Sequence, residues 1–282
     1  MVQVSADGRN APWVRRFILT QALVALGLAV AAPAGAGPSF PYTPDLLSIP
    51  MREATPALWE VRDGDTTIYL FGTFHTLDRR TRWFDRSVRT AFDRSGELVL
   101  ETIVPENPAT LRALGRQAVG PTPNAFLAST RSVIARGKAD GLSIELGADA
   151  VLRRAASNQG KTLAGLERFE DQLRQFAQIP ATTPTPARAS AMPPVTLADL
   201  LTAWKAGDTR AFTAMLAGFE AKAPAAYRIL IADRNARWGE WIANRLDQPG
   251  IVFVAVGSGH LAGKDSVQNW LSSKGILARR VK

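Results

Sequence analysis

The most constraining feature of the sequence is the unbroken apolar run at residues 251–256, which reads Ile-Val-Phe-Val-Ala-Val. A run of this length, rich in β-branched side chains and preceded by a Gln-Pro-Gly turn at residues 248–250, predicts a strand that is buried on both faces. Such a strand needs a covering layer on each side, and in α/β proteins helices supply both layers. The run therefore favours a sheet that is at least partly parallel.

The rest of the chain alternates further strand patterns with helical patterns. Residues 58–61 and 67–70 flank Asp63-Gly64, which indicates a β-hairpin. Shorter strands are predicted at residues 98–100, 162–166 and 276–281. Helices are predicted at residues 83–92, from 107 to 158 with breaks, and at 169–177, 197–204, 209–219, 224–246 and 265–271. This alternation predicts an α/β fold with a mixed, partly parallel sheet flanked by helices.

Two similar motifs come directly after two of these predicted strands. The strand at residues 67–71 ends in Gly-Thr-Phe-His, and the strand at 251–256 ends in Gly-Ser-Gly-His, so that His75 and His260 each follow a glycine by three residues. The strands at 98–100 and 162–166 end in Glu101 and Glu167. Because ligands of open α/β sheets bind beyond the carboxyl ends of the strands, we expect these four side chains at one sheet edge. The glycines would allow a positive φ or a close backbone approach there.

This set of side chains predicts a metal site. Two neutral imidazoles and one carboxylate, from His75, Glu101 and His260, suit a catalytic zinc ion with a water in the open position. The same ligands also suit iron, manganese or cobalt, so the identity of the divalent metal stays open. The alternative is that each histidine is a hydrogen-bonded core or surface residue, and that Glu101 and Glu167 cap helices or form salt bridges.

Two residues on the predicted helix at 224–246 could support catalysis. Arg234 and Asn235 could stabilise a developing oxyanion, while Glu101 or Glu167 accepts a proton from water. The alternative for Arg234 and Asn235 is a solvated helix face with local ion pairs.

The first 53 residues resemble a targeting segment and a linker. A basic region with Arg15-Arg16 precedes a mostly apolar stretch at residues 17–32 and the small residues Ala34-Gly35-Ala36. This layout predicts a signal peptide at residues 1–36 and a periplasmic or secreted protein. The arginine pair is compatible with twin-arginine export as well as with a general signal. An uncleaved membrane anchor is the alternative. Residues 37–53 are predicted to be a linker, and residues 54–282 a single α/β domain.

Composition narrows the classes of partner and of metal site. The chain has no cysteine, which excludes disulfides and thiolate metal sites. Its net charge of +9 is scattered without a long basic run. The charge therefore favours peripheral contact with an anionic envelope surface and does not indicate a nucleic-acid partner. Residues 180–195, rich in proline and threonine, predict a loop.

Three stretches carry a resemblance to a known family. "LWEVRDGDTTIYLFGTFH" from Leu58 on to Glu101, "GLERFEDQL" from Gly165, and "ADRNARWGEWIANRL…VFVAVGSGHLAGKDSV" resemble the TraB/GumN family across roughly residues 55–281. That family is similar to the TIKI metalloproteases and, more distantly, to erythromycin esterase-like and haem-binding ChaN-like proteins. The resemblance implies an α/β fold with duplicated βαβ character and a metal-dependent hydrolase site. It implies metal binding or catalysis for His75, Glu101 and His260, and catalytic support for Arg234 and Asn235. Residues 180–195 depart from the family pattern.

Three functions are compatible with these features. The first is an exported metal-dependent hydrolase, in particular a peptidase, in which a metal-bound water attacks a peptide, amide or ester carbonyl. The second is an envelope protein that binds haem or a metal without turnover. The third is a folded envelope protein whose motifs no longer act.

Overall fold

A computed structural model describes residues 52–84, 86–119, 135, 137–179 and 195–281. Its centre is a six-stranded sheet in the order β6-β5-β7-β3-β2-β8. The strands β6, β5, β7 and β3 run parallel to one another, whereas β2 pairs antiparallel with β3 and β8 pairs antiparallel with β2 at that edge. The bounds of these strands are β2 Leu58–Arg62, β3 Thr66–Thr73, β5 Glu97–Thr102, β6 Thr162–Glu167, β7 Gly250–Gly257 and β8 Arg279–Arg280. The fold is therefore α/β with a mixed, partly parallel sheet.

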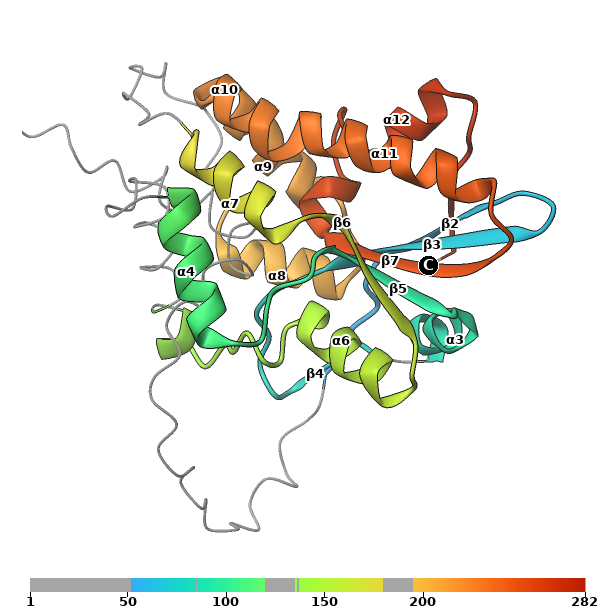
Figure 1. The fold of residues 1–282 in the computed structure, drawn as a ribbon, viewed down its shortest axis with the longest axis horizontal. Coiled ribbons are helices and arrows are strands. Elements are labelled where there is room, and N and C mark those ends of the chain that lie inside the picture. The colour runs from blue at the N-terminus through green and yellow to red at the C-terminus, as the bar shows by residue number, and fades with distance from the viewer. Residues whose placement is uncertain (1–51, 85, 120–134, 136, 180–194, 282) are drawn as a thin grey trace, which may run out of the picture.

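Helices cover both faces of this sheet (Figure 1). Alternate residues of β7 point to opposite sides: Val252 and Val254 lie in the apolar cluster that also contains Trp238 and Ile242 of α11 (Asp233–Leu246) and residues of α12 (Val267–Ser273). Phe253 and Ala255 lie in the larger cluster on the other face, together with residues of α3 (Arg86–Arg94) and α6 (Ala148–Asn158). The strand is buried on both faces, as its composition predicts.

Further helices gather beyond the carboxyl ends of the parallel strands, on the left of Figure 1. They are α4 Pro108–Val119, α7 Phe169–Ala177, α8 Leu197–Lys205, α9 Arg210–Lys222 and α10 Pro224–Tyr227. A separate two-stranded parallel sheet joins β1 (Arg52–Glu53) to β4 (Thr81–Arg82). Helices lie on each connection between consecutive parallel strands: α3 between β3 and β5, α4 and α6 between β5 and β6, and α7 to α11 between β6 and β7.

The structure confirms most of the predicted elements. The hairpin, the strands that start at residues 97, 162 and 250, and the helix over Phe169–Ala177 are all present. The first helical residue after Asn107 is Pro108, and the Asn107 side chain accepts a hydrogen bond from the backbone N–H of Ala109 at 2.8 Å. This is the cap that the sequence predicts.

The predicted helix at residues 224–246 is interrupted. Between α10 and α11 lies a π-helical turn, Arg228–Ala232, in which the backbone N–H of Asp233 donates to the carbonyl of Arg228 five residues earlier. Such a turn inserts one extra residue and rotates the helix that continues beyond it, and turns of this kind are frequent at functional sites. The predicted final strand is also shorter, since only Arg279–Arg280 pairs with β2.

The predicted signal peptide and most of the predicted linker lie outside the described residues, and so does the predicted loop at residues 180–195 apart from Val195. The last two residues of the predicted linker form β1. Among the described residues, none of the helices has the length and apolar character that a membrane span requires.

Candidate functional site

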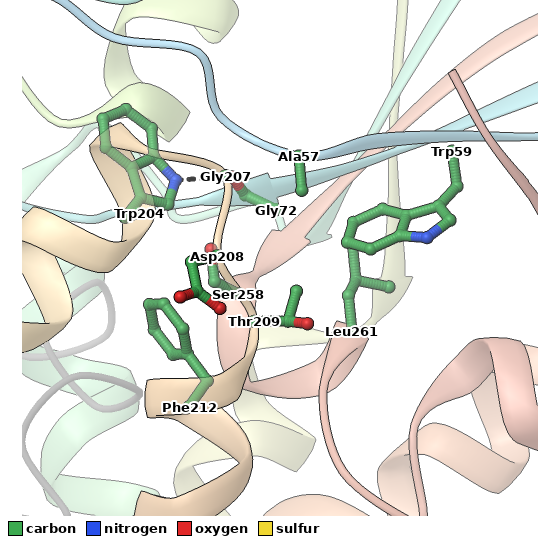
Figure 2. A pocket seen from close by; sticks show the side chains of 10 residues that line it. All are labelled: Ala57, Trp59, Gly72, Trp204, Gly207, Asp208, Thr209, Phe212, Ser258 and Leu261. Carbon is green, nitrogen blue, oxygen red and sulfur yellow. Dashed lines mark hydrogen bonds between the residues drawn. The ribbon is translucent and has the colours of Figure 1, made fainter. Parts of the chain in front are cut away.

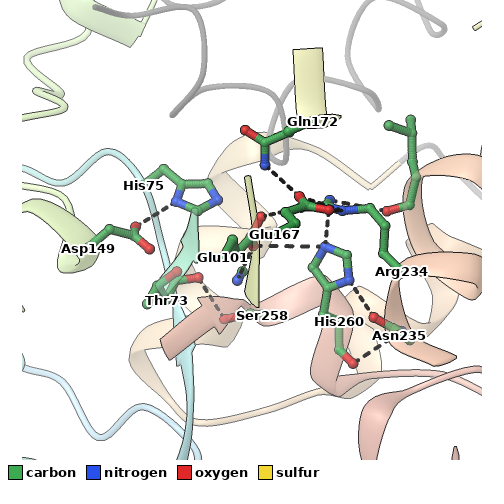
Figure 3. Close-up of polar contacts among 12 residues, drawn as sticks. Thr73, His75, Glu101, Asp149, Glu167, Gln172, Arg234, Asn235, Ser258 and His260 are labelled. Atoms are coloured by element: carbon green, nitrogen blue, oxygen red, sulfur yellow. Dashed lines mark hydrogen bonds and ion pairs between the residues drawn. The ribbon is translucent and has the colours of Figure 1, made fainter. Parts of the chain in front are cut away.

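The carboxyl ends of four parallel strands bring polar side chains together, as the sequence predicts. His75 follows β3, Glu101 lies near the end of β5, Glu167 is the last residue of β6, and His260 lies in a 3₁₀ turn (Ser258–Leu261) after β7. Together with Arg234 and Asn235 of α11 and Asp149 of α6 they lie at one edge of the sheet as two hydrogen-bonded groups, the pair His75–Asp149 and the set around Arg234 (Figure 3). We refer to these seven residues as the polar network.

Arg234 is the hub of the polar network. Its side chain is fully buried and contacts two carboxylates: Nη2 lies 2.7 Å from Glu101 Oε2 and 2.6 Å from Glu167 Oε1. Its Nε also donates to Glu167, and its Nη1 faces the carbonyl of Leu230 and Nε2 of His260. Burial alone would lower the pKa of Arg234, but the charges of Glu167 and Glu101 outweigh it and raise the pKa. All five N–H groups of the guanidinium therefore have acceptors.

Hydrogen bonds fix the ring of His260 in one tautomer. Its Nδ1 lies 2.5 Å from Asn235 Oδ1, and the amide nitrogen of Asn235 donates to the carbonyl of Asp265 at 2.6 Å, so that the Asn235 oxygen must accept. Its Nε2 faces Arg234 Nη1, which can only donate, at 3.2 Å. The proton therefore resides on Nδ1 and the lone pair on Nε2.

The electrostatic surroundings keep His260 neutral. Burial lowers its pKa well below the ordinary value of 6.5, and the positive charges of Arg234 and His75 lower it further. The ring also packs against Trp238 at 4.4 Å between ring centroids, and the Arg234 guanidinium lies 4.4 Å from the same indole. Trp238 thus holds both side chains in position.

For His75, in contrast, the neighbouring negative charge outweighs burial, and the net effect is a raised pKa. Its Nδ1 lies 2.6 Å from Asp149 Oδ2, and its Nε2 is buried with no hydrogen-bond partner. Burial would lower the pKa of His75, but the charge of Asp149 and the hydrogen bond to it, with a smaller contribution from Glu101, raise it above 6.5. Asp149 lies in the first turn of α6, where the helix dipole stabilises a carboxylate. Because a carboxylate accepts the Nδ1 proton, the Nε2 of a neutral His75 carries a free lone pair.

Close backbone contacts hold the histidine segment in place. A Cβ on Gly147 would lie 2.1 Å from the carbonyl oxygen of His75, and the backbone N–H of Ala148 donates to the carbonyl of Phe74 at 3.0 Å. The start of α6, including Asp149, is thereby docked directly on the chain around His75.

Gly72 has a similar role on the other side of β3. A Cβ there would lie 2.8 Å from Ser258 Oγ, and the Gly72 carbonyl accepts a hydrogen bond from the indole of Trp204 at 2.8 Å (Figure 2). The cavity that these residues line has a volume of about 10 Å³, room for one water. Gly72 therefore serves close approach and not positive φ, because among the described glycines positive φ occurs elsewhere.

The polar network fits a bound cation in its charge and its donors. Three carboxylates, from Glu101, Glu167 and Asp149, face one permanent positive charge, so even a protonated His75 leaves an excess of negative charge. Buried charge of this kind needs compensation. A histidine whose Nδ1 is held by a carboxylate while Nε2 stays free is the usual arrangement of a metal ligand. The ligand atoms do not converge on one point, however. Among the described residues, no group of three or more His, Asp and Glu side chains is arranged to hold a metal ion.

The other predicted site residues lie at the same sheet edge. Glu101 Oε1 lies 3.8 Å from His260 Nε2 and accepts the backbone N–H of Gly257 at 2.7 Å. His75 lies at the same edge, but its side chain makes no hydrogen bond or ion pair with Glu101 or His260. Glu167 accepts from Arg234 and from the amides of Gln172 and Gln175, which satisfies both of its oxygens.

The interpretation of Arg234 and Asn235 as a solvated helix face is wrong, because both side chains are buried. The expected oxyanion contact for Arg234 does not follow from the geometry, since its donors are already used. Sequence reasoning missed Asp149, Gly147 and Gln172. The only available signal was Glu-Leu-Gly-Ala-Asp at residues 145–149, a glycine and an acid at a helix start.

Comparisons with known proteins give one match. The model of the TraB/PrgY/gumN family matches residues 57–123 and 109–280. No curated protein and no solved structure matches the chain significantly.

Proposed function

The chain belongs to the TraB/PrgY/gumN family, and on this premise we propose that it is an exported hydrolase of peptide, amide or ester bonds that uses a divalent cation. The observation that carries the proposal is His75, whose buried Nε2 has no partner while Asp149 holds its Nδ1. His260 has the same arrangement with Asn235 in the place of Asp149, but its Nε2 lone pair accepts a hydrogen bond from Arg234 Nη1, which a bound cation would replace.

His75, His260 and Glu101 would hold the cation. A divalent cation bound this way lowers the pKa of its water toward about 7 and polarises a carbonyl. The neutral state of His260 supports this assignment, because only the neutral imidazole has a lone pair to donate. The metal could be zinc, manganese, cobalt or iron, since all accept nitrogen and oxygen donors.

The remaining residues of the polar network position the reactive groups. Asp149 and Asn235 fix the tautomer and orientation of the two histidines. Arg234 Nη2 donates to Glu101 Oε2 and so orients the carboxylate, while Glu101 Oε1 accepts the backbone N–H of Gly257. Glu101 Oε1 would serve either as the third ligand of the cation or as the group that accepts a proton from water and returns it to the leaving amine or alcohol. Glu167 holds Arg234 in turn, so we assign both to positioning.

The hydrolase proposal is tested with chromogenic peptide, amide and ester substrates. Wild type should hydrolyse at least one of them, lose activity after chelation, and regain it when zinc, manganese or cobalt is added. His75→Ala and His260→Ala should each reduce kcat/KM by more than about 100-fold, since even the loss of a residue that only orients a metal ligand costs about 10–100-fold. The exposed control Gln159→Ala, whose side chain donates to Asp93, should match wild type.

Two results would contradict the proposal. Full activity in both histidine variants would show that the polar network does not carry hydrolysis. A wild-type protein that binds a cation tightly but hydrolyses no substrate would instead be a binding protein without turnover. An absorbance scan with haemin then separates haem binding from metal binding.

A further inference from the structure

The polar network and its surroundings contain buried polar atoms that lack partners. Among the described residues these atoms include Thr73 Oγ1, His75 Nε2 and Gln172 Oε1, each on a residue that is less than 5% exposed. An unsatisfied buried polar group costs about 1–3 kcal/mol, so several at one sheet edge require an explanation. Ligands commonly supply the missing hydrogen bonds at such places.

Gln172 is the most informative of these residues. It lies on α7, and its Nε2 donates to Glu167 Oε1 at 3.0 Å. Because Glu167 is an acceptor, this bond fixes which end of the amide is nitrogen and leaves the Oε1 atom without a partner. Figure 3 shows Gln172 with its amide nitrogen directed at Glu167 and its oxygen turned away. A carbonyl oxygen can only accept, so the missing partner must be a donor.

A nearby glutamine shows that the free oxygen of Gln172 is particular to it. Gln175, one turn further along α7, also donates to Glu167, at 3.4 Å. Its Oε1, however, accepts a hydrogen bond from Arg237 at 3.1 Å. The two glutamines therefore share the contact to Glu167 and differ in the oxygen that is left over.

We propose that Gln172 makes the site selective for amide over ester substrates by accepting a hydrogen bond from the substrate N–H. This inference rests on the proposed hydrolase function and specifies its substrate class as peptides or related secondary amides. The N–H of an amide is a donor of the kind that the free oxygen of Gln172 lacks. An ester has the carbonyl acceptor but no N–H, and so leaves Gln172 unsatisfied.

The test compares para-nitroanilides with matched para-nitrophenyl esters of N-acetyl amino acids, using the full protein as isolated with its metal. Gln172→Met keeps the length of the side chain and removes both the amide oxygen and the amide nitrogen that donates to Glu167. It should reduce kcat/KM for the anilides about tenfold more than for the esters, the value of roughly one lost hydrogen bond. Gln175→Met, the matched control, removes a donor to Glu167 and should affect both substrate types equally.

A second measurement needs no variant and so avoids any folding defect of Gln172→Met. For each substrate, kcat/KM is divided by the rate constant of uncatalysed hydrolysis. This ratio should be about tenfold lower for an N-methyl anilide, which lacks the N–H, than for the parent anilide. Equal losses on anilides and esters in Gln172→Met, or no effect of N-methylation, would overturn the inference and mean that a buried water alone satisfies Gln172. Wild-type hydrolysis of esters alone would overturn it while the hydrolase proposal stands. Hydrolysis of neither class would refute the hydrolase proposal itself.

Discussion

Replacing Gly147 by alanine should disrupt the site without touching any polar side chain. The backbone of Gly147 has φ −56° and ψ 152°, a conformation open to every residue, so conformational freedom does not explain the glycine. The contact does: a Cβ would lie 2.1 Å from the carbonyl oxygen of His75, 2.5 Å from its carbonyl carbon and 3.0 Å from the carbonyl oxygen of Ile144.

These distances set the cost of the substitution. Unstrained contacts between heavy atoms lie near 3.5 Å, so α6 and the His75 segment must separate by more than about 1 Å. Overpacking of this kind costs about 1–3 kcal/mol, and loss of the hydrogen bond from Ala148 to Phe74 adds about 1 kcal/mol. For a domain of this size the total of about 2–4 kcal/mol corresponds to a Tm lower by roughly 5–15 °C.

The hydrolytic activity of Gly147→Ala should fall by more than the loss of folded protein accounts for. Catalytic groups need their positions held to within about 0.5 Å, and the shift would move Asp149 away from His75. The assay is thermal unfolding together with hydrolysis at a temperature where the variant is folded. Gly218→Ala is the matched control, because Gly218 lies within α9 with nothing within 4 Å of its Cβ position, and alanine there should stabilise slightly. A Gly147→Ala protein as stable and active as wild type would refute the docking of α6 on His75.

Two further substitutions test the polar network. Arg234→Met should lower the free energy of unfolding, measured in urea, by about 3–5 kcal/mol, because it leaves two buried glutamates without their counter-charge. A decrease below about 1 kcal/mol would mean that these carboxylates are not buried as described. Asp149→Asn should lower metal affinity or kcat/KM about 10–100-fold, measured by competition with a chelating dye and by hydrolysis. Asp208→Asn, at a partly exposed position in contact with Arg210, should change neither, and equal effects of the two substitutions would show that the contact of Asp149 with His75 does not contribute to function.

The sequence predicted the framework of the site because its signals were local. The apolar run at residues 251–256 and the hairpin around Asp63-Gly64 depend only on neighbouring residues, and both are present. The carboxyl-end rule then placed His75, Glu101 and His260 at one sheet edge. This step needed no knowledge of strand order, because parallel strands share that edge whatever their order.

The sequence could not supply the contacts that orient these residues. Asp149 meets His75 across 74 residues, and that contact depends on how α6 docks on the chain after β3. Helical periodicity also placed Arg234 on a regular helix, whereas the π-helical turn at Arg228–Ala232 changes the rotation of α11. A single extra residue in a helical turn leaves no pattern in the sequence, and so burial of Arg234 could not be predicted.

The metal content of the purified protein decides whether His75 and His260 together hold a divalent cation. The protein must carry no polyhistidine tag, because the chain has only two histidines and a tag would mask them. After loading and removal of loosely bound metal, wild type should retain about one divalent ion per chain, and His75→Ala and His260→Ala should each retain far less. Retention of wild-type metal by both variants, or no retention by wild type with any of zinc, manganese, cobalt or iron, would contradict the claim.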